Sequence, residues 1–473
     1  MTKLPTPWST ENSFRLNSRT SAHIPPRVPR WRVLRDLLRL ARRPIPTFQR
    51  YLRTYGDNFT LSVDGSRTTH FTVDPDVVQH VLQRNHRNYE KSEVQTVELG
   101  RYLGFGLLTN SGEDWLRQRR LIQPGFHRQR LQGLADEMQQ VIESECARVS
   151  EQPVTDLFEF TRETAYRIIV RAIFTDDFGD EESATFKSIL DRLQAYVIKP
   201  IRLPFLRAPL RWLGIEERYL ALARQSREMV LSHIRRRREQ SADGYDDLLQ
   251  MLLDTRYEDT GEPMTDEQLV DEVLILFAAG YETSANALAW TVWLLLKHPA
   301  ELAWVRTELA ATGPTRDYTA VTRLPYLTQV IRESMRLYPP AWITDRIAKT
   351  DDRVAGFAIP AGTTVGVFIY GIHRSPQLYE RPDAFLPERM HEDRIKERHS
   401  FAYIPFGGGP RLCIGHHFAL MEMQLFLGHF LDKFDVSPQG ELPRLTPIPF
   451  ITLHQDLPVM IRVREQPQVP TDA

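Results

Sequence analysis

The sequence predicts a single large, mainly α-helical domain with a minor β region. From about Trp115 to His298 the apolar residues recur with the period of about 3.6 residues that is typical of helices. Short alternating runs, typical of strands, occur near the N-terminus and again after residue 350. Neither an internal repeat nor a Gly/Ser-rich linker divides the 473 residues. We therefore expect one catalytic domain over residues 31–465, with a poorly ordered N-terminal extension, 1–30, and a C-terminal tail, 466–473.

The composition is that of an ordinary folded protein, with 42% hydrophobic and 26% charged residues and a net charge of -1. Such a balance creates no global field that would attract nucleic acid or an acidic membrane. The two cysteines, Cys146 and Cys413, are too few for a disulfide framework and indicate a reducing compartment. The N-terminal segment has no apolar run long enough for a signal peptide or a spanning helix. These features predict a cytoplasmic protein with no nucleic-acid partner and no transmembrane anchor.

The first elements can be predicted in chain order. Residues 31–43 have the pattern of a basic amphipathic helix, for which docking on the protein itself and peripheral contact with a membrane both stay open. Two alternating runs, 58–63 and 69–73, are separated by Asp64–Gly65 and predict a hairpin. The proline-containing, apolar and basic segment 199–214 predicts a loop or lid between two helices. Further strands are expected at 353–359, 363–370, 451–453 and 458–463.

The strongest chemical signal is the loop Phe406–Gly415, FGGGPRLCIG, which presents Cys413 at the start of a helical run. Glycines let the backbone approach a planar cofactor, and their amides and the dipole of the following helix favour a thiolate. A thiolate on haem iron pushes electron density toward bound oxygen and promotes O–O cleavage. Cys146, by contrast, lies in an amphipathic helical pattern and is expected to be an ordinary buried residue.

This loop resembles the haem-binding signature Phe-x-x-Gly-x-Arg-x-Cys-x-Gly of the cytochrome P-450 family at every fixed position. The resemblance implies a single cytochrome P-450 fold, in which haem b lies between a long distal helix and the loop with its following helix. It also implies that Cys413 is the axial ligand of the haem iron. The other residues of the loop that it places around the cofactor are Phe406, Gly407, Arg411 and Gly415.

The long distal helix has a strong candidate in residues 265–298, which would measure about 50 Å at the helical rise of about 1.5 Å per residue. Its start is marked by Thr265 followed by Gln268, the pattern of a capping box. Pro299 marks its end.

At the centre of this helix, AGYET resembles the family's Ala/Gly-Gly-x-Asp/Glu-Thr motif. Gly280 leaves room for dioxygen, and the Thr283 hydroxyl can bond to the carbonyl of Ala279, which loosens the helix there. The resemblance implies that Thr283 orients the protons needed for O–O cleavage and that Glu282 belongs to their relay.

The resemblance implies a structural Glu-x-x-Arg helix with a later arginine, and the chain has Glu333, Arg336 and Arg389 at these positions. Alone, a Glu–Arg pair three residues apart would be a solvated surface pair worth little. In the family, these three residues hold the segment that supports the thiolate loop. Their expected role is therefore in folding and haem retention.

Two carboxylates on a buried haem need cations or strong donors. Trp115 and Arg119 match the family's Trp-x-x-x-Arg helix and would lie one turn apart on one face. Arg411 and Arg346 occupy positions that complete this clamp in the family. We expect these four residues to bind the haem propionates.

The segments that the resemblance places around the substrate are overwhelmingly apolar, which indicates a lipophilic small molecule. The runs 337–343 and 106–109 resemble those of bacterial members that hydroxylate carotenoids and of the related fatty-acid hydroxylases. The expected substrate is therefore a carotenoid or other terpenoid, or a long-chain fatty acid. The residues expected to line its cavity are Leu108, Leu276, Ile343, Phe450 and Ile451.

No flavin or iron–sulfur module is recognisable in the 60 residues after Cys413, so electrons from NAD(P)H are expected through a separate ferredoxin or flavodoxin and its reductase. Four arginines near the thiolate side would dock such an acidic partner: Arg117, Arg120, Arg128 and Arg130.

Two other functions stay open. One is a peroxide-dependent hydroxylase of the same fold. The Glu282–Thr283 pair disfavours this function, and Thr283 also disfavours an isomerase that uses no oxygen. The other is a non-enzymatic haem-thiolate sensor or electron carrier, which would need neither a proton relay nor an apolar cavity. Turnover with O2 and NAD(P)H separates these functions.

Overall fold

The computed structural model describes residues 23–62, 68–175, 178–239, 245–312, 319 and 323–466. Its α-helices are α1 (Arg30–Arg42), α2 (Pro44–Tyr55), α3 (Pro75–Gln79), α4 (Gly100–Leu103), α5 (Gly112–Ile122), α6 (Arg128–Gly133), α7 (Ala135–Ser150), α8 (Leu157–Phe174), α9 (Asp180–Arg202), α10 (Arg207–Trp212), α11 (Ile215–Glu239), α12 (Leu248–Asp254), α13 (Asp266–Lys297), α14 (Pro299–Thr312), α16 (Pro325–Leu337), α17 (Ile369–Ile372), α18 (Glu392–Lys396) and α19 (His416–Lys433). Short π or 3-10 segments are η1 (His80–Arg84), η2 (His86–Asn88), η3 (Val94–Leu99), η4 (Gln123–Phe126), η5 (Pro204–Leu206), η6 (Pro387–Met390) and η7 (Gly409–Arg411).

The strands are short and lie mostly at the two ends of the chain. They are β1 (Asn58–Leu61), β2 (Thr69–Thr72), β3 (Tyr89–Glu90), β4 (Thr155–Asp156), β5 (Thr344–Ala348), β6 (Asp352–Val354), β7 (Phe357–Ile359), β8 (Thr364–Val367), β9 (Phe434–Pro438), β10 (Pro447–Pro449), β11 (Leu453–Gln455) and β12 (Met460–Glu465). The prediction of a mainly α fold with a minor β region is thus confirmed.

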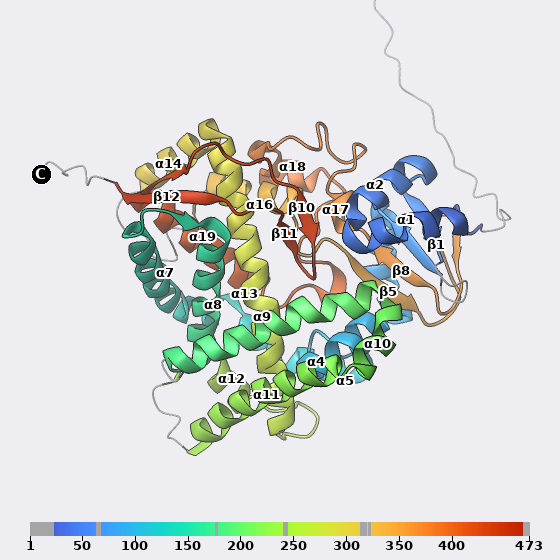
Figure 1. Ribbon diagram of the computed structural model, residues 1–473, viewed down its shortest axis with the longest axis horizontal. Helices are drawn as coiled ribbons and strands as arrows, with labels where there is room; N and C mark the ends of the chain where they lie inside the picture. Colours follow the sequence, from blue (N-terminus) through green and yellow to red (C-terminus); the bar gives the residue numbers. More distant parts are fainter. Residues whose placement is uncertain are drawn as a thin grey trace, which may run out of the picture.

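Helix α13 runs through the middle of the molecule, with α8, α16 and α19 packed around it (Figure 1). Thr265 caps its N-terminus in a capping box with Gln268, and the helix ends just before Pro299, as predicted. Most residues of α13 are buried, and its C-terminal half, which includes Trp290 and Trp293, lies in the main hydrophobic core. A helix that is largely apolar around its circumference is suited to the interior of a large core.

The main sheet has the strand order β1-β2-β8-β5-β3 and lies beside α1 and α2 (Figure 1). β1 and β2 form the predicted hairpin, with Asn58 opposite Thr72, while its connecting residues, 63–67, lie outside the described residues. β2 pairs with β8 in parallel, and β5 pairs with β8 so that Arg346 lies opposite Val365. The sheet thereby fixes the backbone position of Arg346.

Four predicted strands have different bounds in the structure. The strands expected at 451–453 and 458–463 each begin two residues later, as β11 and β12. Residues 353–359 form the hairpin of β6 and β7, because Ala355 and Gly356 reverse the chain with positive φ angles. Strand β8 ends at Val367, and the residues from Ile369 onward form α17 instead of continuing the strand.

The first described residues pack on the sheet. Val28 is buried, and its backbone N–H donates to the Thr60 carbonyl at 3.0 Å. In α1, Val33 is buried against the body, whereas Leu34 and Leu38 are exposed. The predicted apolar stripe therefore docks on the protein only in part. Of the predicted extension, residues 1–22 lie outside the described residues, as do residues 467–473 of the predicted tail.

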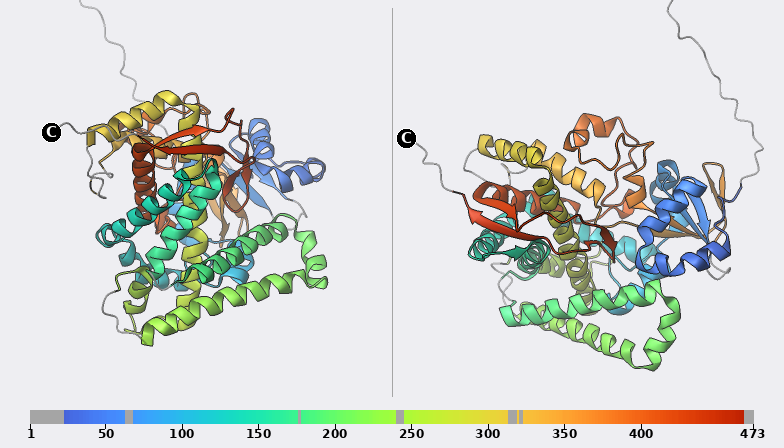
Figure 2. Two further views of the ribbon diagram at one scale, coloured as in Figure 1. Left: turned by 60° about the vertical axis from the view of Figure 1, so that its left-hand side comes forward. Right: turned by 45° about the horizontal axis from the view of Figure 1, so that its top comes forward.

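The segment 199–214 was expected to be a loop, and this prediction is wrong. Helix α9 continues to Arg202 through Pro200, and η5 and α10 follow before α11 begins (Figure 2). Prolines suit short helical segments because their fixed φ is helical and the missing N–H costs little in a first turn. The segment does connect two long helices, α9 and α11, as predicted.

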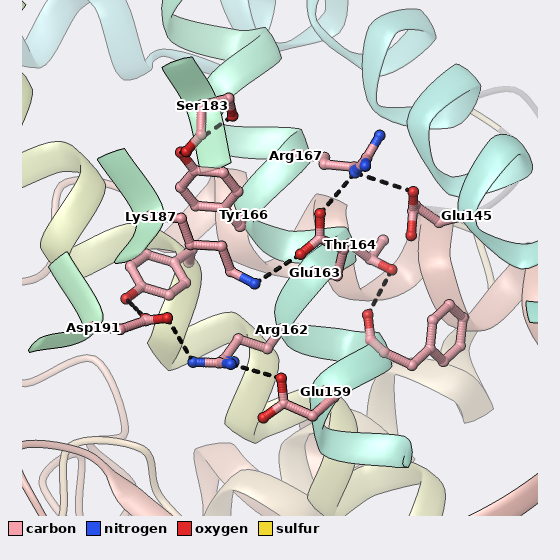
Figure 3. A network of polar contacts seen from close by, with 12 residues as sticks. Glu145, Glu159, Arg162, Glu163, Thr164, Tyr166, Arg167, Ser183, Lys187 and Asp191 are labelled. Carbon is pink, nitrogen blue, oxygen red and sulfur yellow. Dashed lines mark hydrogen bonds and ion pairs between the residues drawn. The ribbon is translucent and has the colours of Figure 1, made fainter. Parts of the chain in front are cut away.

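Polar contacts fix the first half of α9 over α8 (Figure 3). The Arg162 guanidinium donates to Asp191 at 2.9 Å and to Glu159 at 2.6 Å, and Lys187 donates to Glu163 at 2.7 Å. These contacts join the two helices and determine the position from which α9 extends to Arg202.

In the part of the chain that the structure describes, no helix combines the length and the apolar character required to cross a bilayer.

Candidate active site

The loop before Cys413 has a backbone conformation that favours glycine at two positions. Gly407 and Gly409 have φ angles of 76° and 69°, and a Cβ on Gly409 would lie 1.9 Å from the Leu82 carbonyl oxygen. The N–H of Cys413 donates to the Phe406 carbonyl at 3.0 Å, and α19 starts three residues after Cys413. The loop thus holds the cysteine rigidly ahead of a buried helix.

Cys413 lies deep within the protein, yet its side chain is accessible, so it faces an interior space. Burial raises the pKa of this thiol, and the Gly415 backbone N–H and Arg119 oppose the shift without cancelling it. The Gly415 amide thus favours the thiolate, as expected of the loop, and burial opposes it. Coordination to a metal cation deprotonates such a thiol. Cys146, by contrast, is fully buried in the hydrophobic core, as expected.

The predicted propionate ligands gather near this loop. Arg119 Nη1 donates to the Leu412 carbonyl at 2.9 Å, and the Arg411 guanidinium lies 5.1 Å from the centre of the Trp115 ring. Arg346 is buried on β5. The structure adds Lys91, whose ammonium lies 5.9 Å from the same ring and donates to the Leu107 carbonyl at 2.6 Å. No motif marks this lysine in the sequence.

These four basic residues form a buried cluster of positive charge. Burial lowers the pKa of Arg346 to about 10 and, together with Arg346 and Arg411, lowers that of Lys91 to about 6. Among the described residues, none of the four forms an ion pair with a carboxylate, and Arg411 Nε is buried without a hydrogen-bond partner. Such a cluster is costly unless anionic groups enter it. The chemistry fits the two propionates of a haem.

One face of α13 is accessible although the rest of this helix is buried. The residues on it follow helical spacing: Leu276, Ala279, Gly280 and Thr283. The Thr283 hydroxyl donates to the Ala279 carbonyl at 2.8 Å, as the sequence predicted. A Cβ on Gly280 would lie 3.2 Å from Ile169, so this position is already crowded on its other side.

The Glu282 side chain points away from this face, toward the turn of residues 450–452 between β10 and β11, called here the C-terminal turn. Its Oε1 accepts from the Thr452 hydroxyl at 2.8 Å and lies 2.5 Å from His454 Nε2, whereas its Oε2 is buried without a hydrogen-bond partner. Sequence reasoning missed Thr452 and His454, which lie at least 170 residues from Glu282 in the chain.

Helix α13 is also tied to the helix that follows the cysteine loop. Ser284, next to Thr283, donates to the Glu422 carboxyl of α19 at 2.6 Å. Burial raises the pKa of Glu422 to about 8. This contact fixes the spacing between the distal helix and the cysteine loop.

The predicted scaffold residues form one buried ion-pair network. Arg336 donates twice to Glu333 at 2.8 Å and also to the carbonyls of His373 and Pro382. Arg389 Nε lies 3.3 Å from Glu333, with Glu333 and Arg336 fully buried. The network joins α16 to η6 and to the coil before the cysteine loop.

The predicted cavity residues come from four segments, which hydrogen bonds join in two pairs. Trp342 Nε1, beside Ile343, donates to the carbonyl of Phe450, the neighbour of Ile451. The Leu107 N–H, beside Leu108, donates to Glu272, which lies one turn before Leu276. All these apolar side chains are partly accessible, and Phe450 is 40% exposed.

The arginines predicted to dock a redox partner have different environments. Arg117 pairs with Asp259 at 3.1 Å and lies 4.6 Å from the Tyr257 ring centre, so it is engaged within the protein. Arg120 is exposed on α5. The side chains of Arg128 and Arg130 lie outside the described part of the structure.

Comparison with known proteins decides the family. The family model described as Cytochrome P450 matches residues 25–461. The chain is a cytochrome P450. It is similar to cyclooctatin synthase of Streptomyces melanosporofaciens, with 32% identity over 85% of this chain and 87% of that protein. It is also similar to pentalenene oxygenase of Streptomyces avermitilis, with 29% identity over 91% of this chain and 94% of that protein.

A solved structure described as the haem domain of cytochrome P450DA superposes with a TM-score of 0.84. It is 26% identical and covers 95% of this chain and 99% of that one. Another relative, cyclooctat-9-en-7-ol 5-monooxygenase of Streptomyces melanosporofaciens, is 30% identical over 92% of this chain and 91% of that protein. As a cytochrome P450, this protein is a monooxygenase of the oxidoreductase class, and the family implies a haem cofactor.

Proposed function

We propose that this cytochrome P450 hydroxylates a lipophilic terpenoid, including carotenoids, or a long-chain fatty acid. It uses O2 and electrons from NAD(P)H that a separate ferredoxin or flavodoxin and its reductase deliver. The observation that carries this proposal is the accessible face of α13, where the Thr283 hydroxyl stands beside apolar residues and next to Glu282. The names of the relatives support a terpenoid substrate, because they include an oxygenase of pentalenene.

In this proposal, Cys413 would bind the iron of haem b through its thiolate, and Phe406, Gly407 and Gly415 shape the loop around it. Arg119, Arg346 and Arg411 bind the propionates together with Trp115, and Lys91 adds a fourth cation to the clamp. When bound, a haem with a thiolate ligand supplies the activation of dioxygen. The protein's own contribution is to hold this group, to keep the cysteine coordinated and to exclude bulk water.

Proton delivery is assigned to α13. The Thr283 hydroxyl donates its proton to the Ala279 carbonyl in the structure and would turn from it to donate to a group on the accessible face, on which Gly280 also lies. Glu282, whose Oε1 is held by Thr452 and His454, would then turn to return a proton to the Thr283 oxygen. The partly exposed His454 connects Glu282 toward solvent.

The proposal is tested by turnover of the holoenzyme with O2, NAD(P)H and a surrogate ferredoxin with its reductase. Terpenes and fatty acids serve as substrates, and products are identified by mass spectrometry with 18O2. One labelled oxygen atom in the product supports a monooxygenase. Product with hydrogen peroxide but none with O2 would support the peroxide-dependent alternative. Unchanged lipids under both conditions would support the sensor or electron carrier.

Thr283→Ala is expected to uncouple electron use from product formation. Product per NAD(P)H should fall by about 10- to 100-fold while peroxide rises, because one positioned proton donor contributes about 10²-fold or more. Peroxide release and NAD(P)H consumption measure the effect. Thr291→Ala is the matched control, since Thr291 makes the same bond to the carbonyl four residues back at a buried position of the same helix. Equal coupling in both variants would remove Thr283 from the relay.

A further inference from the structure

Buried arginines in this protein are mostly paired with carboxylates. Arg237 pairs with Asp247 at 2.9 Å, and Arg336 pairs with Glu333 at 2.8 Å. The cations of the propionate clamp are exceptions, and their anionic partner is the haem. One further arginine, Arg202, is partly buried and forms no ion pair with any described residue. Burial lowers its pKa to about 10, with no acid to oppose the shift.

Arg202 is the last residue of α9 and lies where three segments meet. Its Nη1 donates to the Ala41 carbonyl, at the end of α1, at 3.4 Å, near the limit of a hydrogen bond. Its guanidinium lies 5.9 Å from the centre of the Phe450 ring, in the C-terminal turn. Its Nη2 is buried and has no hydrogen-bond partner among the described residues. A buried donor of a charged group without a partner is costly, so this arrangement fits a ligand that supplies an acceptor.

The Phe450 ring beside Arg202 is 40% exposed and belongs to a residue predicted to line the substrate cavity. On its other side, this ring packs against that of His454, with 5.1 Å between their centres. A ligand held by Arg202 would therefore lie against the predicted lining of the cavity.

The course of α9 indicates the distance between Arg202 and the oxygen motif of α13. Gln194 of α9 donates to the Ala278 carbonyl, next to the oxygen motif, at 3.3 Å. Arg202 lies eight residues further along the helix, which corresponds to about 12 Å at the helical rise. A group bound at Arg202 is thus about 12 Å from the oxidation site, a distance that an extended lipid chain can bridge.

We infer that Arg202 binds the carboxylate of the substrate, so that the molecule oxidised by this enzyme is a long lipophilic carboxylic acid held by its head group. This inference rests on the proposed function and narrows its substrate class. A guanidinium forms strong, charge-assisted hydrogen bonds with carboxylates. One cation balances a monoanion, whereas a diphosphate would leave buried negative charge. The acid is oxidised far from its carboxyl group, about 12 Å along the chain.

The inference is tested by equilibrium binding to the purified holoenzyme. The probes are hexadecanoic acid and hexadecan-1-ol, which share a carbon chain and differ in head-group charge. Dissociation constants are measured by equilibrium dialysis with labelled ligand and by the shift of the Soret band. Wild-type protein should bind the acid about 10-fold more tightly than the alcohol, as one charge-assisted bond allows. In Arg202→Gln this preference should disappear while binding of the alcohol stays within about 2-fold of wild type.

Arg192→Gln is the matched control, because Arg192 is exposed on the same helix and the variant removes the same charge. It should keep the preference for the acid, and Arg202→Lys should keep part of it. The inference is contradicted if wild type binds neither probe or shows no preference, or if Arg202→Gln weakens both ligands equally. The carbon-monoxide spectrum of each variant shows separately whether the haem-thiolate enzyme of the proposed function is intact.

Discussion

Replacing Cys413 with serine is expected to reduce hydroxylation by on the order of 10³-fold or more, which corresponds to about 4 kcal/mol of lost transition-state stabilisation. The hydroxyl of serine lies at the same point of the rigid loop, but it lacks the polarisable thiolate that favours O–O cleavage on haem iron. Product formation under O2 and NAD(P)H measures the effect, and the absorption spectrum reports on the ligand.

The control for this experiment is Cys146→Ser, because Cys146 is the only other cysteine of the chain. It is fully buried in the hydrophobic core, so its replacement should lower stability without changing the spectrum of the bound haem. Hydroxylation by Cys413→Ser at the wild-type rate would rule out Cys413 as the working ligand.

Arg336→Met is expected to lower the free energy of unfolding by about 3–5 kcal/mol. This is the usual cost of removing one partner of a buried ion pair and leaving the other charge uncompensated. The change leaves Glu333 buried with Arg389 as its remaining cation and removes the donor from the carbonyls of His373 and Pro382. Urea unfolding of the purified protein gives the stability, and absorbance gives the haem content, which should fall with it.

The matched control is Lys396→Met, which breaks the pair between Lys396 and Asp393, also three residues apart but exposed on both sides. Its expected cost is under about 1 kcal/mol, as for most exposed pairs. A similar, small cost for Arg336→Met would show that the network does not support the fold.

The features that the sequence predicted correctly depend on short-range order or on a strong motif. The capping box at Thr265 and the bond from Thr283 to Ala279 follow from residues within one helical turn of each other. The contact between Glu333 and Arg336 is also local, whereas its complete burial is known only from the structure.

Other features depend on tertiary contacts that no local pattern reports. Lys91 lies near Trp115 from a segment without a motif, and His454 reaches Glu282 from the far end of the chain. Burial of the loop raises the pKa of the Cys413 thiol against the opposing Gly415 amide and Arg119, and no local pattern reports that burial. Burial and long-range pairing, not residue type, decide these features.

The most direct test of the central claim is the carbon-monoxide difference spectrum of the dithionite-reduced protein. Ligation of haem iron by the Cys413 thiolate predicts a Soret band strongly shifted to the red of that of a histidine-ligated haem. A band at the histidine-ligated position in freshly prepared protein would contradict the account, because Cys413 would then not be the ligand.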